Sequence, residues 1–219
     1  MDATGIDVSV KYGKTVEIAA TLLEEGRNSP ADIFLAQDPG GLGVVANAEM
    51  LIDLPDSILE LVPKWARSPE GKWVGLSGRA RTIVYNTGTL SEADLPDSIA
   101  GLTNPKWKGR IGWAPANGSF QAMVTGMRVL WGEEKTRGWL IGMQTNDPKI
   151  YPKNTPQVAA VAAGEIDVGL VNHYYVHRFL QEEGDTFPAR NYHPRAGGPG
   201  SLVMVAGAGI IRKGKNHEN

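Results

Sequence analysis

Short apolar runs alternate along this chain with stretches of helical periodicity, and this alternation limits the fold more than any other feature. Apolar or alternating runs predict strands at "IDVSVKY", "ADIFLA", "WVGLSGRARTIVYN", "GRIGWA", "EIDVGLV" and "SLVMVAGAGII", with "ADIFLA" expected to be buried. Helical spacing predicts helices at "TVEIAATLLEEG", "SFQAMVTGMRVLWG", "TPQVAAVAAG" and "HYYVHRFLQEEG". Strands that alternate with helices indicate an α/β architecture with largely parallel sheets.

Capping signals set the expected helix boundaries. The first helix is expected to end at Gly26 and to bury a face that includes Val16 and Leu23. In "TPQVAAVAAG" we expect Thr155 as the N-cap and Pro156 at the first helical position.

Composition excludes several function classes. A net charge of −2 over 219 residues gives no electrostatic reason to expect nucleic acid or an anionic membrane as partner. The absence of cysteine excludes disulfides, thiolate zinc sites and a cysteine nucleophile. No apolar run reaches the roughly 20 residues that span a bilayer. The start "MDATGIDVSV" lacks the features of a signal peptide, so an exported form would have lost its targeting segment.

Polar turns follow three of the predicted strands: Gln37 and Asp38, Asn117–Ser119, and Asn172–Tyr175. In open α/β sheets, ligands bind beyond the carboxyl ends of strands, where helix N-termini favour anions. We therefore expect the three turns to converge on one cleft. The alternative is that small polar residues stand there only because turns and helix caps need them.

The adjacent pair Tyr174 and Tyr175 lies where a strand gives way to a helix. Adjacent helical residues point about 100° apart, so one ring could serve the core and the other a site, unless a bent first turn aims both at the cleft. Phenolate oxygen is a hard, anionic ligand that suits ferric iron better than zinc or copper(I). The alternative is a pair of packing tyrosines with their hydroxyls at the surface.

Two further pairs could carry chemistry. Arg79 and Arg81 lie two apart in an extended run, so both point to one face and could bind a carboxylate, phosphate or carbonate, or else form local salt bridges. His173 and His177 lie four apart and could bind zinc on one helix face. No glutamate or third ligand accompanies the histidines, so a helix-surface pair is the favoured interpretation.

Five strings together resemble the iron(III)-binding proteins of bacterial ABC importers: "SPADIFLAQDPGGLG", "GLSGRARTIVYN", "PANGSFQAMV", "YPKNTPQVAAVAAGEIDVGLVNHYY" and "GPGSLVMVAGAGIIRKGKN". The resemblance covers nearly the whole chain. It implies a two-lobed α/β fold of the type II periplasmic-binding-protein kind that closes on its ligand at a hinge. The implied lobes are residues 1–81 with 205–219, and residues 82–204. Family members start earlier and continue further, so the resemblance also implies truncation at both ends, with a metal ligand upstream of residue 1.

The resemblance also implies roles for individual residues. Tyr174 and Tyr175 match the iron-ligating pair, and Tyr12 is a further candidate phenolate. Gln37 falls where some members place a ligating glutamate, but an amide cannot supply that charge. The expected anion site comprises Arg79 or Arg81, Asn117, Gly118, Ser119, Asn154 and Asn172, holding carbonate or phosphate beside Fe(3+).

The implied function is non-enzymatic capture of ferric iron and delivery to the permease of an ABC importer. The implied location is periplasmic, or extracellular on a lipid anchor, and an incomplete first lobe is expected to promote self-association. One rival is a binding protein of the same fold for thiamine, a polyamine or a phosphonate, with the tyrosines as an aromatic wall. A less favoured rival is a zinc-dependent hydrolase that uses His173 and His177.

The neutral amide of Gln37 leads to a first prediction. We expect its side chain to hydrogen-bond to an anion, a water or a backbone group rather than to coordinate metal, because it carries no negative charge. A crystal structure of the iron-loaded protein checks this. A Gln37 side-chain oxygen within bonding distance of iron would contradict it.

Overall fold

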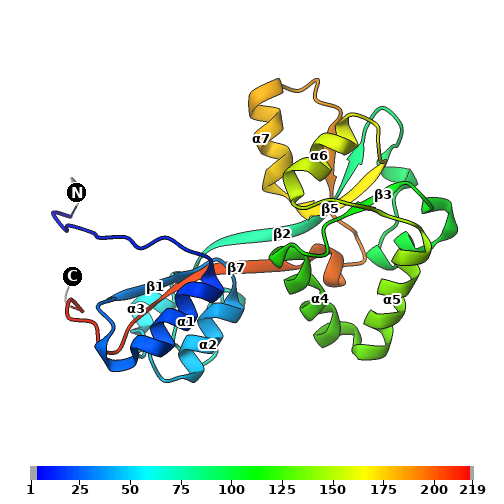
Figure 1. Ribbon diagram of the computed structural model, residues 1–219. Helices are drawn as coiled ribbons and strands as arrows, with labels where there is room; N and C mark the ends of the chain where they lie inside the picture. The colour runs from blue at the N-terminus through cyan, green and yellow to red at the C-terminus, as the bar shows by residue number, and fades with distance from the viewer. Residues whose placement is uncertain (1–3, 218–219) are drawn as a thin grey trace. The chain divides into compact units, whose positions relative to one another are not determined.

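The computed structural model describes residues 4–217, and the chain divides into two units. The first unit runs to Gly78 and resumes at Met204, and the second unit is Arg79–Val203 (Figure 1). Strand β2 (Val74–Asn86) begins in the first unit and ends in the second. Within residues 4–217, no helix has the length and apolar character needed to span a membrane.

The first unit is a small sheet covered by helices. Its other elements are α1 (Thr15–Glu25), η1 (Gly26–Asn28), β1 (Ile33–Ala36), α2 (Pro39–Asn47), α3 (Asp56–Leu59), η2 (Lys64–Ala66) and most of β7 (Val203–Ile210). Strands β1 and β7 pair antiparallel, with Ile33 opposite Ile210. Phe34 and Ala36 of β1 are buried in a cluster with Leu22 of α1 and Leu42 of α2. The unit therefore has a core of its own, on the face of the sheet that α1 and α2 cover.

The second unit contains the larger set of elements. After β2 come η3 (Glu92–Asp94), η4 (Ile99–Thr103), η5 (Pro105–Trp107), β3 (Ile111–Trp113), α4 (Gly118–Trp131), α5 (Glu133–Thr145), β4 (Lys149–Ile150), α6 (Asn154–Ala162), β5 (Val168–Asn172), α7 (Tyr174–Glu183), β6 (Ala189–Tyr192) and η6 (Gly198–Ser201). Most of the predicted strands and helices are present. Helices α2, α3 and α5 and strands β4 and β6 were not predicted.

Parallel pairing is confined to part of the second unit, so the expectation of largely parallel sheets is wrong. Strand β3 pairs in parallel with β4 and with β5, and helices α4 to α6 connect these three strands. Strand β2 pairs antiparallel with both β5 and β6, and β1 pairs antiparallel with β7. Successive strands pair in parallel only where a helix returns the chain to the end of the sheet at which the first strand began. Helices do so between β3, β4 and β5.

Helices cover both faces of the sheet in the second unit. Helices α6 and α7 lie on one side of β5 and β2, and α4 and α5 lie on the other (Figure 1). Alternate residues of β5 point into the two cores: Leu170 joins the cluster with Met123 of α4, and Val171 joins the cluster with Val158 of α6. This period-two division fixes which side chains of β5 and β2 face each helix layer.

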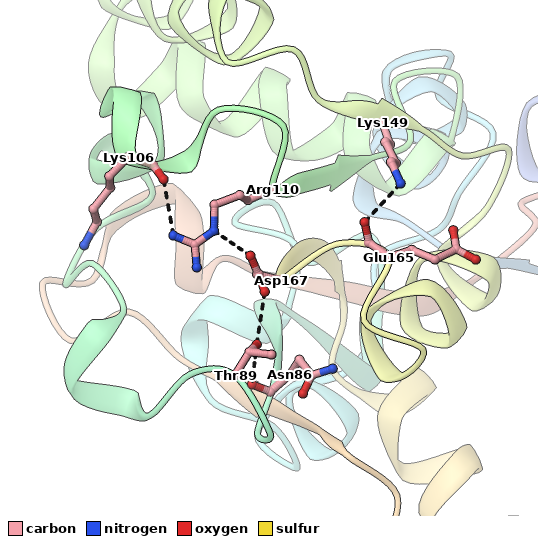
Figure 2. Close-up of polar contacts among 7 residues, drawn as sticks. All are labelled: Asn86, Thr89, Lys106, Arg110, Lys149, Glu165 and Asp167. Atoms are coloured by element: carbon pink, nitrogen blue, oxygen red, sulfur yellow. Dashed lines mark hydrogen bonds and ion pairs between the residues drawn. The ribbon is translucent and has the colours of Figure 1, made fainter.

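A polar network holds the amino ends of β3 and β5 together. Arg110, just before β3, pairs with Asp167, just before β5, with 2.5 Å between Nε and a carboxylate oxygen. The hydroxyl of Thr89 donates to the other carboxylate oxygen of Asp167 at 3.0 Å (Figure 2). Because β3 and β5 are parallel, fixing their amino ends also fixes the register of their carboxyl ends, where the predicted polar turns lie.

Two strand predictions differ from the structure. Residues 6–12 form no strand, and Val8, Val10 and Tyr12 are exposed. Their alternation suits a half-buried strand, but no neighbouring strand pairs with them within residues 4–217. "ADIFLA" does form β1 but is buried on one face only, since Ile33 and Leu35 are exposed by 63% and 62%.

Two helix details also differ. Helix α1 ends at Gly26 as expected, but it buries Leu22 and leaves Val16 and Leu23 exposed. Helix α6 begins at Asn154, so Thr155 is not its N-cap. The Asn154 side chain reaches toward the neighbouring helix instead of capping its own.

The exposed edge of β1 leads to a prediction about association. β1 lies at the end of the strand order, and within residues 4–217 no strand pairs with its outer edge. Exposed strand edges with apolar side chains template pairing between chains.

We expect concentration-dependent association of the wild type in sedimentation velocity. We expect less association for Leu35→Lys, because a charge on the edge opposes pairing. Val129→Lys, at an exposed position of α4, is the control and should associate like the wild type. Equal association of all three proteins, or a wild type that stays monomeric at every concentration, would contradict this.

Candidate functional site

The tyrosine pair begins helix α7, one residue after β5 ends. Val176, next along the helix, is buried in the core and anchors this first turn. The rings of Tyr174 and Tyr175 lie against each other, with centroids 4.4 Å apart and planes tilted by 31°. Both are half-buried. The two rings are therefore in contact, and Tyr175 also packs against the buried cluster that includes Val158 and Val171.

The surroundings of Tyr175 affect the ionisation of its phenol. Burial, followed by the hydrogen bond to Tyr174, raises the pKa of Tyr175 above its ordinary value, while a hydrogen bond from Asn154 and the charge of Arg178 act to lower it. The raised pKa keeps the phenol neutral at physiological pH. A metal ion that binds its oxygen must therefore displace a proton.

Arg81 of β2 is the largest charged group buried in the second unit, with 1% of its surface exposed. Its Nη1 donates to Oδ1 of Asn172 at 3.0 Å and to Oγ of Ser119 at 3.2 Å, and its Nη2 donates to the carbonyl of Leu170 at 2.8 Å. Arg81 and Asn172 are opposite each other in the antiparallel β2–β5 register. The strand pairing therefore brings the guanidinium to the carboxyl end of β5, next to the tyrosine pair.

The charge of Arg81 has no acidic partner in the described part of the chain. None of the ion pairs among residues 4–217 involves Arg81, and its buried Nε has no hydrogen-bond acceptor there. Burial lowers the pKa of the guanidinium to about 10, while ionised Tyr174 and Tyr175 would raise it. The group stays charged at neutral pH. A buried cation without a counter-ion is costly, so the surroundings of Arg81 favour negative charge close by.

The turn before α4 supplies the next part of the site. Oδ1 of Asn117 accepts from the Ser119 backbone N–H at 3.0 Å and caps the helix. The Ser119 hydroxyl lies between Arg81 Nη1 and Asn154 Nδ2, both of which donate to it, at 3.2 and 3.3 Å. Gly118, the first residue of α4, is exposed. The helix N-terminus thus adds its partial positive charge to that of the guanidinium.

Asn154 joins helix α6 to this cluster. Its side chain is almost fully buried, and its Oδ1 has no hydrogen-bond donor among the described residues. Its amide contacts both Ser119 and Tyr175. An unpartnered buried acceptor requires an explanation, such as a ligand or ordered water that the protein binds there.

Several of the predicted site residues come together within the second unit: Arg81, Asn117, Ser119, Asn154, Asn172, Tyr174 and Tyr175. Arg79 is half-buried on the same face of β2, but the described bonds to Asn172 and Ser119 come from Arg81. Gln37 and Tyr12 belong to the first unit. Gln37 is exposed and its backbone N–H donates to Thr15 Oγ1 at 3.2 Å, and Tyr12 is exposed by 88%. Their roles stay predictions.

The turn after "ADIFLA" is a helix start. Asp38 is the N-cap of α2, and its carboxylate accepts from the Gly41 N–H at 3.1 Å. The sequence "DPGG" therefore serves as a cap followed by proline at the first helical position, a pattern that favours helix initiation.

The two histidines do not form a metal site in the described chain. Nδ1 of His173 accepts a hydrogen bond from the Ala80 N–H at 3.1 Å, so this ring nitrogen is already used. Within residues 4–217 there is no group of three or more histidine, cysteine, aspartate or glutamate side chains that could hold a metal ion. The zinc-hydrolase alternative has no geometric support in this region.

Two residues near the site were not predicted from the sequence. Arg178, one turn beyond the tyrosines on α7, acts electrostatically on Tyr175. Asn191 of β6 donates its side-chain N–H to the carbonyl of His173 at 2.8 Å. The i, i+3 spacing from Tyr175 could have indicated Arg178. Asn191 lies in a short strand, "ARNY", that gave no clear alternating pattern.

Residues 28–211 match the family model described as bacterial extracellular solute-binding protein. The chain belongs to this family. Its resemblance to the ferric iron-binding members is confirmed by curated relatives. The major ferric iron-binding protein of Neisseria meningitidis serogroup B is 38% identical over 226 residues, which cover 99% of this chain and 66% of the relative. The Fe(3+)-binding periplasmic protein of Serratia marcescens is 34% identical, covering 98% of this chain and 64% of the relative. The chain thus spans slightly less than two thirds of these relatives.

Solved structures confirm the fold class. Iron-bound HitA from Pseudomonas aeruginosa aligns with a TM-score of 0.90 and 34% identity, over 99% of this chain and 70% of that one. The Trichodesmium protein IdiA (FutA), solved in complex with iron and citrate ligands, aligns with a TM-score of 0.87 and 31% identity, over 98% of this chain and 70% of that one. The α/β fold of the type II periplasmic-binding-protein class is therefore established for the family member described here.

The contacts of Tyr175 lead to a prediction about its ionisation. In a spectrophotometric titration of the apo protein, the difference between wild type and Tyr175→Phe should show a phenol whose pKa is higher than that of free tyrosine. The same difference measured in an Asn154→Ala background should give a still higher pKa, because that change removes a hydrogen bond to the phenolate. Thr155→Ala, an exposed neighbour, is the control. A Tyr175 pKa in the wild type that is no higher than that of free tyrosine, or one that Asn154→Ala leaves unchanged, would contradict this environment.

Proposed function

We propose that the chain captures ferric iron through the phenolate oxygens of Tyr174 and Tyr175, as the extracytoplasmic component of an ABC importer. One observation carries the proposal. Two tyrosines in ring contact lie beside a buried guanidinium, Arg81, that has no acidic partner within residues 4–217. The names of the two curated relatives given above, both ferric iron-binding proteins, support the same cargo.

The guanidinium determines which form of the tyrosines is favoured. Without cargo the Tyr175 phenol is neutral, because its pKa is raised, and Arg81 carries an unbalanced charge. When ferric iron displaces the phenol protons, the new phenolates lie near the guanidinium and each stabilises the other's charged form. Ferric iron with two phenolates still carries excess positive charge, and Arg81 adds to it. The site therefore needs further anionic oxygen.

A synergistic anion meets that need. We place carbonate or phosphate against Ser119, Asn154 and the N-terminus of α4. The Ser119 hydroxyl, which donates to Oδ1 of Asn117 in the structure, would turn to the anion, and the Asn154 amide and backbone N–H groups would donate to its other oxygens. Arg81 supplies the opposite charge. The citrate in the Trichodesmium complex shows that a related protein accommodates an organic anion together with iron.

Membership of the family supports the remaining parts of the proposal. We place the protein in the periplasm or at the cell surface on a lipid anchor, where it would deliver iron to a permease without catalysing a reaction. Tyr12 stays a candidate for a further phenolate, and Gln37 a candidate hydrogen-bonding group. Release would require the phenolates to regain protons. Apparent affinity should therefore fall by up to about tenfold per pH unit for each proton involved as pH decreases.

The tyrosine variants test the proposal directly. Tyr174→Phe and Tyr175→Phe keep the rings but remove one anionic oxygen each. We expect each single variant to lose affinity for ferric iron by at least about 100-fold, because a charged metal–oxygen bond is worth more than the roughly 3 kcal/mol of a strong charged hydrogen bond. The double variant should lose both binding and the visible phenolate-to-iron charge-transfer colour. Equilibrium competition against a chelator, with absorbance in the visible range, measures both.

The control and the contradicting outcome are specific. Tyr151→Phe, which removes a buried hydroxyl outside the site cluster, should bind iron like the wild type. If the double variant of Tyr174 and Tyr175 binds ferric iron with unchanged affinity and colour, the pair is packing and the proposal is wrong. A wild type that stays colourless with iron but binds thiamine, a polyamine or a phosphonate would support the organic-ligand alternative.

A further inference from the structure

His173 lies between the end of β5 and the start of α7, and three hydrogen bonds fix it. Its backbone N–H donates to the carbonyl of Ala80 at 3.0 Å, and its ring Nδ1 accepts from the Ala80 N–H at 3.1 Å. Its carbonyl accepts from Nδ2 of Asn191 at 2.8 Å. Its ring also lies edge-on to the ring of Tyr174, with centroids 5.8 Å apart. The residue thus connects β2, β6 and α7.

These bonds take the place of the last hydrogen-bonded residue pair between β2 and β5. Arg81 pairs with Asn172, so the next pair along the two strands is Ala80 with His173. In a regular antiparallel sheet, such a hydrogen-bonded pair exchanges both backbone N–H···O=C bonds. Here the first bond is present, but the Ala80 N–H bonds to the imidazole instead of to the His173 carbonyl. The carbonyl turns to Asn191.

Because the imidazole takes the place of the backbone acceptor, the chain can change direction within a single residue. His173 has helical dihedral angles, φ −53° and ψ −38°, although its N–H still belongs to the strand ladder. A helical conformation turns its carbonyl away from Ala80, which would leave the Ala80 N–H unpaired. The imidazole removes that cost, since Ala80 is half-buried and an N–H that lacks an acceptor away from water is destabilising. Helix α7 can therefore start immediately, with Tyr174 and Tyr175 in its first turn.

We propose that His173 is a positioning residue for the tyrosine pair: its Nδ1 closes the β2–β5 ladder in place of a backbone carbonyl and thereby fixes both phenols relative to Arg81. The role in cargo binding rests on the proposed function, in which the two tyrosines bind ferric iron. For Nδ1 to accept, the ring proton must be on Nε2. His173 does not itself touch the metal.

Substitutions that move the acceptor by one bond test this. The side-chain oxygen of asparagine is attached where Nδ1 is attached in histidine, whereas glutamine places its amide one carbon further out. His173→Asn should keep the bond to Ala80, and His173→Gln should lose it. His177→Gln is the matched control, because His177 touches the His173 ring, with centroids 6.2 Å apart, but is exposed on the next turn of α7.

The first readouts use the apo protein and need no iron. Amide hydrogen exchange at Ala80 should be about fivefold faster in His173→Gln than in the wild type, which corresponds to about 1 kcal/mol for one hydrogen bond. The ring signals of Tyr174 and Tyr175 in tyrosine-labelled protein should shift in the same variant. His173→Asn and His177→Gln should match the wild type in both. If His173→Gln does not fold, Asn191→Ala, which removes only the donor to the His173 carbonyl, should shift the same tyrosine signals.

The last readout uses iron. Release of ferric iron to a competing chelator should be at least about fivefold faster from His173→Gln, with a displaced charge-transfer band, and should return to the wild-type rate in His173→Asn. Unchanged Ala80 exchange and tyrosine signals in His173→Gln would overturn the positioning role, whether or not iron binds. If the apo results are as expected but the wild type takes up no iron, the positioning role is supported and the proposed function fails.

Discussion

The buried guanidinium of Arg81 is the interaction on which the site depends. It is held by the carbonyl of Leu170, the amide of Asn172 and the hydroxyl of Ser119, all neutral acceptors. Such a shell can orient a cation but cannot neutralise it. The protein therefore keeps a positive charge out of water without an acid to balance it within residues 4–217. This arrangement lowers the stability of the folded protein. It suits a site in which negative charge appears only when cargo binds, because that charge then balances the guanidinium.

The topology of the second unit explains how this charge comes to lie beside the phenols. Parallel strands β3 and β5 bring the start of α4 and the start of α7 to one edge of the sheet. Strand β2 enters antiparallel to β5 and delivers Arg81 to the same edge. The ion pair of Arg110 with Asp167 fixes the opposite edge. The positions of the site residues thus follow from strand register, which a one-residue slip would destroy by turning Arg81 to the other face.

The sequence predicted those parts of the site that depend on local pattern. The tyrosine pair at a strand-to-helix junction, the Asn117 cap and the long strand of Arg81 could be identified from periodicity and capping residues. Contacts set by tertiary register could not be identified in this way. Nothing local separates Arg81 from Arg79, and the short strand of Asn191 has no alternation to detect. The prediction of a strand at residues 6–12 is wrong for the opposite reason. The alternation there is clear, but a strand also needs a neighbouring strand to pair with.

Ultraviolet difference absorption tests the central claim most directly, because it counts the tyrosines that ionise when ferric iron binds. We expect wild-type apo protein, titrated with a ferric chelate at neutral pH, to show the absorption of both Tyr174 and Tyr175 as phenolates at saturation. The signal should fall by that of one phenolate in either single phenylalanine variant that still binds. Iron bound at saturation with every tyrosine protonated would contradict the claim, because the buried charge of Arg81 would then have no phenolate to stabilise.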